Sequence, residues 1–368
     1  METETLIIGA GPAGLACAGA LKMHGITAQI LEKGESVGTV WRHHYDRLHL
    51  HTAKQYSGLP GHPMPKDYPR YPSKNQVIDY LEDYARHFGI SPDFNTEVTK
   101  IRSKDRWEIE TSRQTYTAKN VIFAGGVASH PHIGKFTGIE SFEGQVIHSN
   151  DYQNAEPFRG KHVLVIGFGN SGGEIALDLA EAGIETTMSV RSPVNVIPRD
   201  VLGIPAQSFS IAERHLPPRL VDLLNGGITR LRTGDITKLG LKKSTKGPVT
   251  QIVEDKRIPL IDIGTLKAIK DGLVSVRGKI ERVDGNEVRF EDAKKDRFDA
   301  IILATGFKPN LREILPDLNE ALDAHGAPKK SGSESGPKGF AFCGYRVSPT
   351  GYLREIRLEA EAIAKEMA

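Results

Sequence analysis

The chain has 368 residues, 39% of them hydrophobic and 26% charged, and its formal net charge at pH 7 is +2. That length and hydrophobic content suffice for one large or two ordinary domains with buried cores, which excludes a disordered or fibrous protein. The near-neutral charge favours neither a nucleic-acid-binding protein nor an acidic solvating tail. Cys17 and Cys343 are the only cysteines and form no CxxC motif, which fits a reducing compartment.

The start of the chain predicts its location. Residues 1–5 are acidic and lead directly into apolar residues 6–8, unlike the basic start of a signal peptide. No stretch approaches the ~20 uninterrupted apolar residues of a spanning helix, and neither end carries a basic amphipathic run. We therefore expect a cytoplasmic protein with no nucleic-acid or membrane partner and no metal site.

Short apolar runs bounded by Gly or Asp predict buried parallel strands. In chain order they are Leu6–Ile8, Ala28–Leu31, Val121–Phe123, Val163–Ile166, Thr186–Val190 and Ala300–Leu303. Helical periodicity occurs over 13–24, 76–88 and 171–182. This alternation predicts an α/β fold with a doubly wound sheet, and the similar units at the N-terminus and near residue 163 indicate two nucleotide-binding modules.

A glycine motif follows the first predicted strand: Gly9-Ala10-Gly11-Pro12-Ala13-Gly14. Between a strand and a helix, this GxGxxG pattern predicts a dinucleotide site. The first glycine allows a tight turn, the second lets the backbone approach a pyrophosphate, and the third allows close helix packing, while the helix N-terminus supplies amide donors. Glu32 ends the next strand, where a carboxylate can accept hydrogen bonds from a free ribose 2′-hydroxyl. The alternative is a purely structural turn.

The second unit repeats the motif as Gly167-Phe168-Gly169-Asn170-Ser171-Gly172. Its next strand ends in Arg191-Ser192 instead of an acid, and a guanidinium there suits the 2′-phosphate of NADPH. An exposed loop arginine without a ligand is the alternative for Arg191. Because NADPH delivers a hydride that a bound flavin can receive, two sites of different type predict FAD at the first and NADPH at the second.

The late Ala304-Thr305-Gly306 returns the chain toward the first domain. The predicted fold is thus α/β with two dinucleotide-binding Rossmann-like domains, in the two-domain architecture of the disulfide reductases. The FAD-binding domain comprises residues 1–140 and 306–368, and the NADPH-binding domain, residues 141–305, is inserted between them.

A longer motif lies between the glycine motifs: Phe142-Glu-Gly144-Gln-Val-Ile-His148-Ser-Asn-Asp-Tyr152. It resembles the FxGxxxHxxx-aromatic fingerprint of the flavin-containing monooxygenases, or class B flavoprotein monooxygenases. Further matches are Trp41-Arg42, Tyr45-Asp-Arg-Leu48, Leu50-His51-Thr52, Tyr71-Pro-Ser-Lys74 and Ala304-Thr305-Gly306-Phe307. The resemblance covers nearly the whole chain, and segments 45–54, 169–198 and 262–310 look most like the plant YUCCA-type branch.

The resemblance implies further cofactor contacts and a catalytic position. The implied contacts are Lys33, Thr39, Trp41, Arg42, Leu48, Thr52, Val98, Ala124, Gly125, Ala304, Thr305, Gly306 and Gly344. His51 takes the catalytic position, where many members carry an asparagine that helps hold the nicotinamide and the peroxyflavin. The family's first Ala-Thr-Gly is replaced by Ala124-Gly125-Gly126, which lacks the threonine.

Some of these residues also have a structural interpretation. The linker between the domains could simply be held in place by Phe142, His148 and Tyr152. We expect His148 to hold the linker and orient the NADPH domain rather than to transfer protons. Trp41 and Tyr45 could be core residues, although an aromatic side chain near a flavin offers a surface for stacking and excludes water.

The activity implied is that of an NADPH- and FAD-dependent monooxygenase. In the family, NADPH reduces FAD, O2 adds to the reduced flavin, and the flavin hydroperoxide transfers one oxygen atom to a small organic substrate. The alternatives are an oxidoreductase of disulfide-reductase type, which the missing CxxC disfavours, and a non-catalytic NADPH-sensing flavoprotein. Besides the substrate and O2, a second copy of the chain in a homodimer is a possible partner.

Segment 198–259 matches no nucleotide-binding pattern, and we expect it to form one wall of the approach to the active site. Its basic residues are Arg199, Arg214, Arg219, Arg230, Arg232, Lys242, Lys243 and Arg257, beside apolar residues such as Leu202, Ile204, Phe209, Leu223 and Leu224. A solvated basic surface is the alternative. An apolar channel with a cationic mouth would favour a hydrophobic carboxylate. The YUCCA-like segments imply aromatic 2-oxo acids such as indole-3-pyruvate, with sulfides and amines as other candidates.

Overall fold

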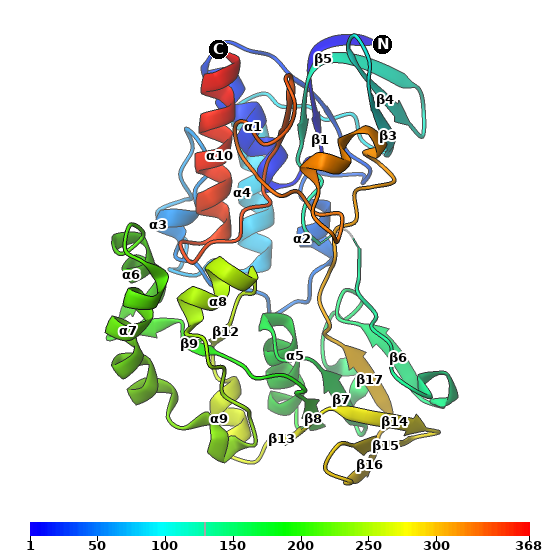
Figure 1. Cartoon of the computed structure of the whole chain (residues 1–368), viewed down its shortest axis with the longest axis vertical. Helices are drawn as coiled ribbons and strands as arrows, with labels where there is room; N and C mark the ends of the chain where they lie inside the picture. Colours follow the sequence, from blue (N-terminus) through cyan, green and yellow to red (C-terminus); the bar gives the residue numbers. More distant parts are fainter. Residues whose placement is uncertain (129) are drawn as a thin grey trace. The chain divides into compact units, whose positions relative to one another are not determined.

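Two compact α/β units make up the fold, as predicted. The computed structural model describes residues 1–128 and 130–368. Unit 1 comprises Met1–His43, Thr52–His130 and Phe307–Ala368, and unit 2 comprises His44–His51 and Pro131–Gly306 (Figure 1). Unit 1 therefore receives unit 2 as an insertion.

The bounds of unit 2 differ from the sequence-based range 141–305. It begins at Pro131 and also takes in residues 44–51. The early start follows from Phe136 and Ile139, which pack against a core cluster of the unit, and the extra segment follows from Tyr45, which is buried in another. The assignment of FAD and NADPH to the two units stays a prediction.

The sheet of unit 1 is parallel at its centre. Strands β1 (Glu2–Ile8), β2 (Gln29–Leu31), β5 (Thr115–Phe123) and β18 (Phe340–Phe342) run parallel, and β3 (Val98–Ser103) and β4 (Trp107–Thr111) continue the sheet from β5 in antiparallel pairing. The predicted strands 6–8 and 121–123 are confirmed as parts of β1 and β5, and the predicted strand 28–31 is confirmed as β2 except for Ala28. Because β18 pairs with β5, the segments before and after the insertion share one sheet.

Helices of unit 1 pack closely on one another. Helix α1 (Pro12–Met23) contacts α10 (Tyr352–Met367) and α4 (Lys74–His87), as Figure 1 shows. Gly19 of α1 allows the approach of α4, because a Cβ there would collide with the Tyr84 hydroxyl. Short helices α2 (Thr39–His43), α3 (Lys54–Ser57) and a 3-10 turn, η4 (Pro316–Ala321), complete the unit.

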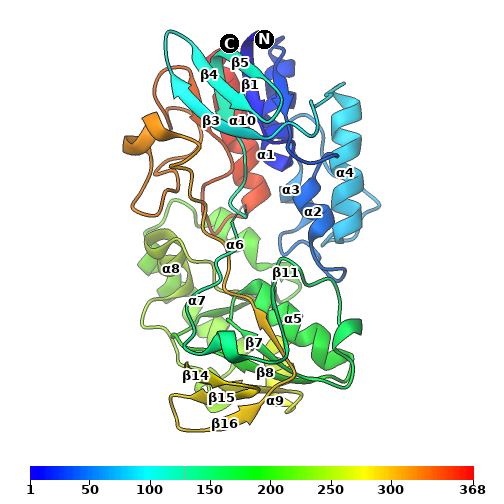
Figure 2. The same cartoon turned by 90° about the vertical axis from the view of Figure 1, so that its right-hand side faces the viewer.

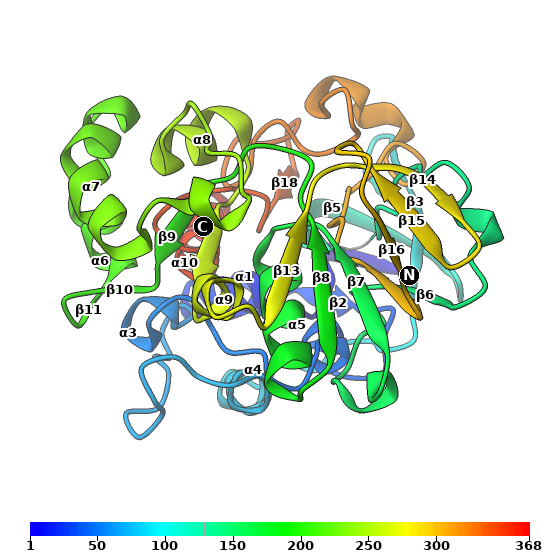
Figure 3. The same ribbon diagram turned by 90° about the horizontal axis from the view of Figure 1, so that it is seen from below.

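Unit 2 contains a fully parallel five-stranded sheet in the order β13-β8-β7-β17-β6 (Figure 3). Its strands are β6 (Gln145–His148), β7 (His162–Ile166), β8 (Glu185–Ser189), β13 (Val274–Arg277) and β17 (Ala300–Leu303). Helices α5 (Asn170–Glu181) and α9 (Thr265–Lys270) pack together beside it. A small antiparallel sheet contains β14 (Ile280–Asp284), β15 (Glu287–Phe290) and β16 (Lys295–Arg297) (Figure 2).

The segment between β8 and α9 is mainly helical. It holds strands β9 (Val196–Pro198), β10 (Asp200–Val201), β11 (Ile204–Pro205) and β12 (Leu260–Asp262), helices α6 (Ala206–Ala212), α7 (Pro218–Thr233) and α8 (Pro248–Asp255), and η3 (Ile236–Leu239). Two further 3-10 turns, η1 (Ile139–Ser141) and η2 (Glu156–Phe158), lie in the stretch before β7. None of the helices in the described parts of the chain is long and apolar enough to cross a membrane.

Candidate functional site

The carboxyl ends of the parallel strands in unit 1 meet at one edge of its sheet. Ile8 aligns with Leu31 of β2 and with Phe123 of β5, and Phe123 aligns with Phe342 of β18. The residues that follow these strands therefore share that edge, among them the predicted contacts Gly9, Glu32, Lys33, Ala124, Gly125 and Gly344. Nucleotides bind at this edge in open α/β sheets.

The three glycines of the first motif have different surroundings. Gly9 has φ +100°, and a Cβ on it would lie 2.6 Å from the Ala124 carbonyl oxygen; a Cβ on Gly14 would collide with the Gly9 carbonyl oxygen. Gly11 has an ordinary φ of −79°, and no atom in the described chain lies within 4 Å of its hypothetical Cβ. The protein itself thus gives no reason for a glycine at position 11, and the space in front of α1 fits a phosphate that approaches the backbone.

Glu32 holds the first glycine loop in place. Its carboxylate is 7% exposed, and its two oxygens accept the backbone N–H groups of Ala10 at 2.6 Å and Gly34 at 2.8 Å. A carboxylate oxygen can accept more than one hydrogen bond, so both oxygens keep capacity for a ribose hydroxyl. The charge at the end of β2 is thereby fixed beside the loop.

The second motif reproduces the same arrangement. Gly167 has φ +123°, and a Cβ on it would collide with the Ala304 carbonyl oxygen; a Cβ on Gly172 would lie 2.5 Å from the Gly167 carbonyl oxygen. Gly169, at φ −94°, has open space in front of its hypothetical Cβ, with no described atom within 4 Å. Both loops therefore leave an open position at the start of a helix of 12 residues.

Arg191 follows β8 at the edge formed by the carboxyl ends of the unit 2 strands, where Ser189 aligns with Ile166 and Ile166 with Leu303. Its side chain is exposed and makes no hydrogen bond or ion pair with the residues that the structure describes. Asn170 behaves differently, because its Oδ1 accepts the backbone N–H of Ile261 at 2.8 Å and so holds β12 against α5. Arg191 is thus available to a ligand, whereas the Asn170 oxygen already has a protein partner.

His51 belongs to a buried cluster around Glu174 of α5. Glu174 is 1% exposed; its Oε1 lies 2.7 Å from His51 Nε2 and accepts the Tyr45 hydroxyl at 3.1 Å, and its Oε2 has no hydrogen-bond partner among the described residues. Burial, followed by the Glu174 charge, raises the pKa of Tyr45 well above its usual value. Glu174 was not among the residues predicted from the sequence, although an acid among the apolar residues at the start of α5 is itself a signal.

His148 contacts the backbone of the segment that follows β17. Its Nε2 lies 3.2 Å from the Gly306 carbonyl oxygen, and its Nδ1 accepts the Asn150 N–H at 3.1 Å. Burial lowers the pKa of His148, which favours the neutral ring with the proton on Nε2. Tyr152 of the same motif donates to Asp178 at 2.6 Å. These contacts support the structural interpretation of the fingerprint within unit 2.

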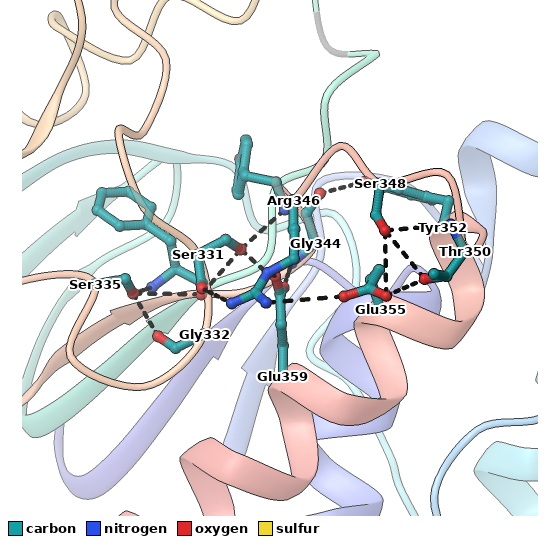
Figure 4. A network of polar contacts seen from close by, with 12 residues as sticks. Ser331, Gly332, Ser335, Gly344, Arg346, Ser348, Thr350, Tyr352, Glu355 and Glu359 are labelled. Carbon is teal, nitrogen blue, oxygen red and sulfur yellow. Dashed lines mark hydrogen bonds and ion pairs between the residues drawn. The ribbon is translucent and has the colours of Figure 1, made fainter. Parts of the chain in front are cut away.

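Gly344 has structural reasons to be glycine. Its φ is +85°, a Cβ would lie 2.9 Å from the Cβ of Ala13, and its N–H donates to Glu359 Oε2 at 2.7 Å while its carbonyl accepts the Tyr352 hydroxyl (Figure 4). Glu359 also accepts the Ser331 hydroxyl at 2.8 Å, and burial raises the pKa of its carboxyl group. This network, which was not predicted from the sequence, fixes the turn after β18 against α10.

The other predicted residues divide between the units. Unit 1 holds Pro12, Ala13, Thr39, Trp41, Arg42, Thr52 and Val98, and unit 2 holds Leu48, Ser171, Ser192, Thr305 and Gly306. Arg42 pairs with Glu82 of α4, the Thr52 hydroxyl lies 3.0 Å from that of Ser57, and Thr305 donates to the His132 carbonyl. Val98 is buried in the core of unit 1, where packing explains it.

The two cysteines meet, although they are far apart in the sequence. Both are completely buried, and a hydrogen bond with Cys17, together with burial, raises the pKa of the Cys343 thiol well above its usual value. Redox-active cysteines are instead accessible and have lowered pKa values. The pair is therefore unsuited to attack a disulfide substrate.

Comparison with known proteins identifies the family. The family described as pyridine nucleotide-disulphide oxidoreductase matches residues 6–201. Indole-3-pyruvate monooxygenase YUCCA6 of Arabidopsis thaliana is 41% identical, with 86% of this chain and 78% of that protein covered. The chain belongs to the YUCCA-type flavin monooxygenases.

Solved structures agree with the fold of this family. A flavin-containing monooxygenase from Stenotrophomonas maltophilia superposes with a TM-score of 0.75 at 22% identity, over 100% of this chain and 99% of that one. Bacillithiol disulfide reductase from Staphylococcus aureus has a TM-score of 0.72 at 18% identity, over 100% and 98%. The protein is thus a flavin-dependent monooxygenase on a fold that disulfide reductases share, and the monooxygenase interpretation is favoured over both alternatives.

Proposed function

We propose that this monooxygenase uses FAD in unit 1 and NADPH in unit 2 to convert an aromatic 2-oxo acid into the acid one carbon shorter. The main support for this proposal is the pair of glycine loops. In each loop the space in front of the middle glycine is open, and one loop lies beside the buried Glu32 and the other beside the exposed Arg191. A carboxylate suits a free ribose 2′-hydroxyl, and an unpaired guanidinium suits a 2′-phosphate. Glu32 therefore supports FAD, and Arg191 supports NADPH.

The reaction balances in atoms and electrons. A 2-oxo acid, O2, NADPH and one proton give the shortened carboxylate, CO2, water and NADP⁺; NADPH supplies two electrons, and the bond between the two carbonyl carbons breaks. The bound flavin supplies the hydride acceptance and oxygen activation that no amino-acid side chain provides. The relatives named as indole-3-pyruvate monooxygenases support this substrate class.

The chain's own residues hold and orient the cofactors in this proposal. The open amides of the α1 and α5 first turns bind the pyrophosphates, and Glu32 and Arg191 distinguish the riboses. His51 stands in place of the family asparagine, with its Nε2 2.7 Å from Glu174 Oε1 and without a hydrogen-bond partner among the described residues. We assign His51 the positioning of substrate or nicotinamide.

Product analysis tests the proposal. Turnover of indole-3-pyruvate under ¹⁸O2 should place one labelled oxygen atom in the product acid and the other in water, with one NADPH consumed per acid formed. Neutral sulfides and tertiary amines of similar size should react with lower kcat/KM, and the preference for the acid should shrink at high salt if cationic side chains steer it. A salt-independent preference for sulfides or amines would reject the 2-oxo acid and leave the monooxygenase class intact.

A further inference from the structure

Helix α7 turns its apolar side chains toward solvent. Leu223 is 77% exposed, Leu224 57% and Leu231 84%, and Leu220 and Ile228 are exposed as well. Residues at these positions share one face of a helix with 3.6 residues per turn. Val221 is the one buried residue of α7, all of which the structure describes.

The opposite face of α7 is polar and bonds to the rest of unit 2. Asp222 accepts the backbone N–H groups of Val249 and Thr250 at 2.8 and 2.9 Å, and Asn225 donates to Glu213 at 2.7 Å. A helix on a globular protein normally buries its apolar stripe and exposes its polar one. Helix α7 is thus inverted, because its leucine stripe faces solvent and its polar face bonds to the unit.

The hairpin next to α6 and the turn before α7 expose further apolar residues. Leu202, at the tip between β10 and β11, is 77% exposed and has φ +51°, a conformation that leucine rarely adopts; Ile204 is 48% and Leu216 42% exposed. We call the exposed residues of this segment the leucine surface: Leu202, Ile204, Leu216, Leu220, Leu223, Leu224, Ile228 and Leu231. Helices α6 and α7 lie together at one edge of unit 2, away from its parallel sheet (Figures 1 and 3).

Arginines border the leucine surface. Arg214, Arg219, Arg230 and Arg232 are exposed, and Arg219 lies 3.7 Å from Glu254 of α8. The two acids of residues 202–232, Glu213 and Asp222, are engaged by Asn225 and by α8. A two-fold interface between copies of this surface would bring the same arginines together, which repels. A negatively charged, apolar partner matches both properties, and an anionic bilayer offers phosphates above an acyl region.

We propose that the leucine surface docks this enzyme on an anionic lipid bilayer. The leucines enter the boundary between headgroups and acyl chains, and the arginines contact lipid phosphates. No helix spans the bilayer in this arrangement. The proposal departs from the sequence-based expectation of no membrane partner, and the experiment below decides between the two.

Vesicle binding of the flavin-loaded full chain tests the proposal. We expect flotation with vesicles of phosphatidylcholine and phosphatidylglycerol, weaker flotation with phosphatidylcholine alone, and release at high salt. Leu223→Ser/Leu231→Ser should reduce the partition coefficient about tenfold or more. The control Leu273→Ser/Leu358→Ser removes leucines that are 54% and 38% exposed outside the surface and should bind like the parent.

Further measurements separate the proposal from its rivals. Both double variants should keep their flavin content and NADPH oxidation, and Arg230→Gln/Arg232→Gln should lose the preference for phosphatidylglycerol. Absence of vesicle binding by the parent, or equal binding by the two leucine variants, would overturn the proposal. If Leu223→Ser/Leu231→Ser instead converts a dimer into a monomer without any vesicle binding, the surface belongs to a second copy of the chain.

Discussion

The middle glycine of each motif differs from its neighbours in what it contacts. Gly9 and Gly14 are required by the protein's own backbone, through a positive φ and a close approach, whereas Gly11 faces open space. In the second motif, the protein's own backbone likewise requires Gly167 and Gly172, whereas Gly169 faces open space. A substitution at the middle position therefore tests ligand binding with little direct cost to folding.

Gly11→Val should impair the binding of FAD, and Gly169→Val should impair the binding of NADPH. Gly11→Val should abolish FAD binding, because the added side chain fills the space of the pyrophosphate. Gly169→Val should keep about one FAD per chain and raise the KM for NADPH. Flavin released by denaturation and steady-state kinetics measure both effects, and unchanged flavin content in Gly11→Val would contradict the assignment of the first site.

Arg191→Ala should change the choice of nicotinamide cofactor. Loss of a charged hydrogen bond to the 2′-phosphate costs about 1.5 to 3 kcal/mol, so the ratio of kcat/KM for NADPH over NADH should fall roughly tenfold to hundredfold. Arg232→Ala, which removes another exposed arginine of unit 2, is the matched control. A ratio that stays at the parent value would make Arg191 a bystander.

Sequence patterns predicted the site residues that stand at a fixed position relative to the end of a strand. The glycines, Glu32 and Arg191 stand at fixed distances from strand ends, so their places at the sheet edges follow from chain order. Glu174 and Glu359 obey no such rule, because their partners come from segments distant in the sequence. His51 was singled out by resemblance, but its pairing with Glu174 needed the fold.

At the scale of the elements, a contact of His148 connects the end of β6 to the turn at Gly306. His148 ends β6 and contacts the Gly306 carbonyl at the end of unit 2. Its pKa lies below the ordinary 6.5 because the ring is buried, so the folded state binds the proton less readily than the unfolded chain. The stability gained by burying the neutral ring is full above pH ~6.5 and is lost as the pH falls through the lowered pKa, because the charged ring is costly to bury.

His148→Gln should therefore destabilise the protein at neutral pH and matter less in acid. The gap in free energy of unfolding between parent and variant should narrow as the pH falls below about 6.5. Denaturant titrations across this pH range measure the gap. His215→Gln, at an exposed position of unit 2, serves as control, and a gap that widens in acid would contradict the neutral, buried ring.

The strand segments that could be predicted are the buried ones. Continuous apolar runs identified parts of β1, β2, β5, β7, β8 and β17, because strands covered on both faces lose their alternation. Strands β3 and β4 bury only some of their residues, contain no continuous apolar run, and were not predicted. In helix α7 the apolar periodicity would predict a buried face, but the apolar side chains face solvent.

At the scale of the molecule, each unit has a hydrophobic core of its own. Ligand effects should accordingly stay within units. In hydrogen exchange, removal of FAD should deprotect residues 8–15 and 32–34, and NADP⁺ should protect residues 166–173 and 189–192. Protection of the β1–α1 loop by NADP⁺ alone would contradict the assignment of the cofactors.

The pairing of β18 with β5 has a consequence for synthesis on the ribosome. Residues 44–51 of unit 2 emerge before β5, and residues 131–306 emerge between β5 and the late elements β18 and α10. Unit 2 is therefore complete while α1 still lacks its partner α10. The nascent chain should acquire its domains out of sequence order, with the inserted one first. A ribosome-bound chain arrested well past Gly306 but before Phe340 should retain NADP⁺ affinity while remaining unable to take up flavin.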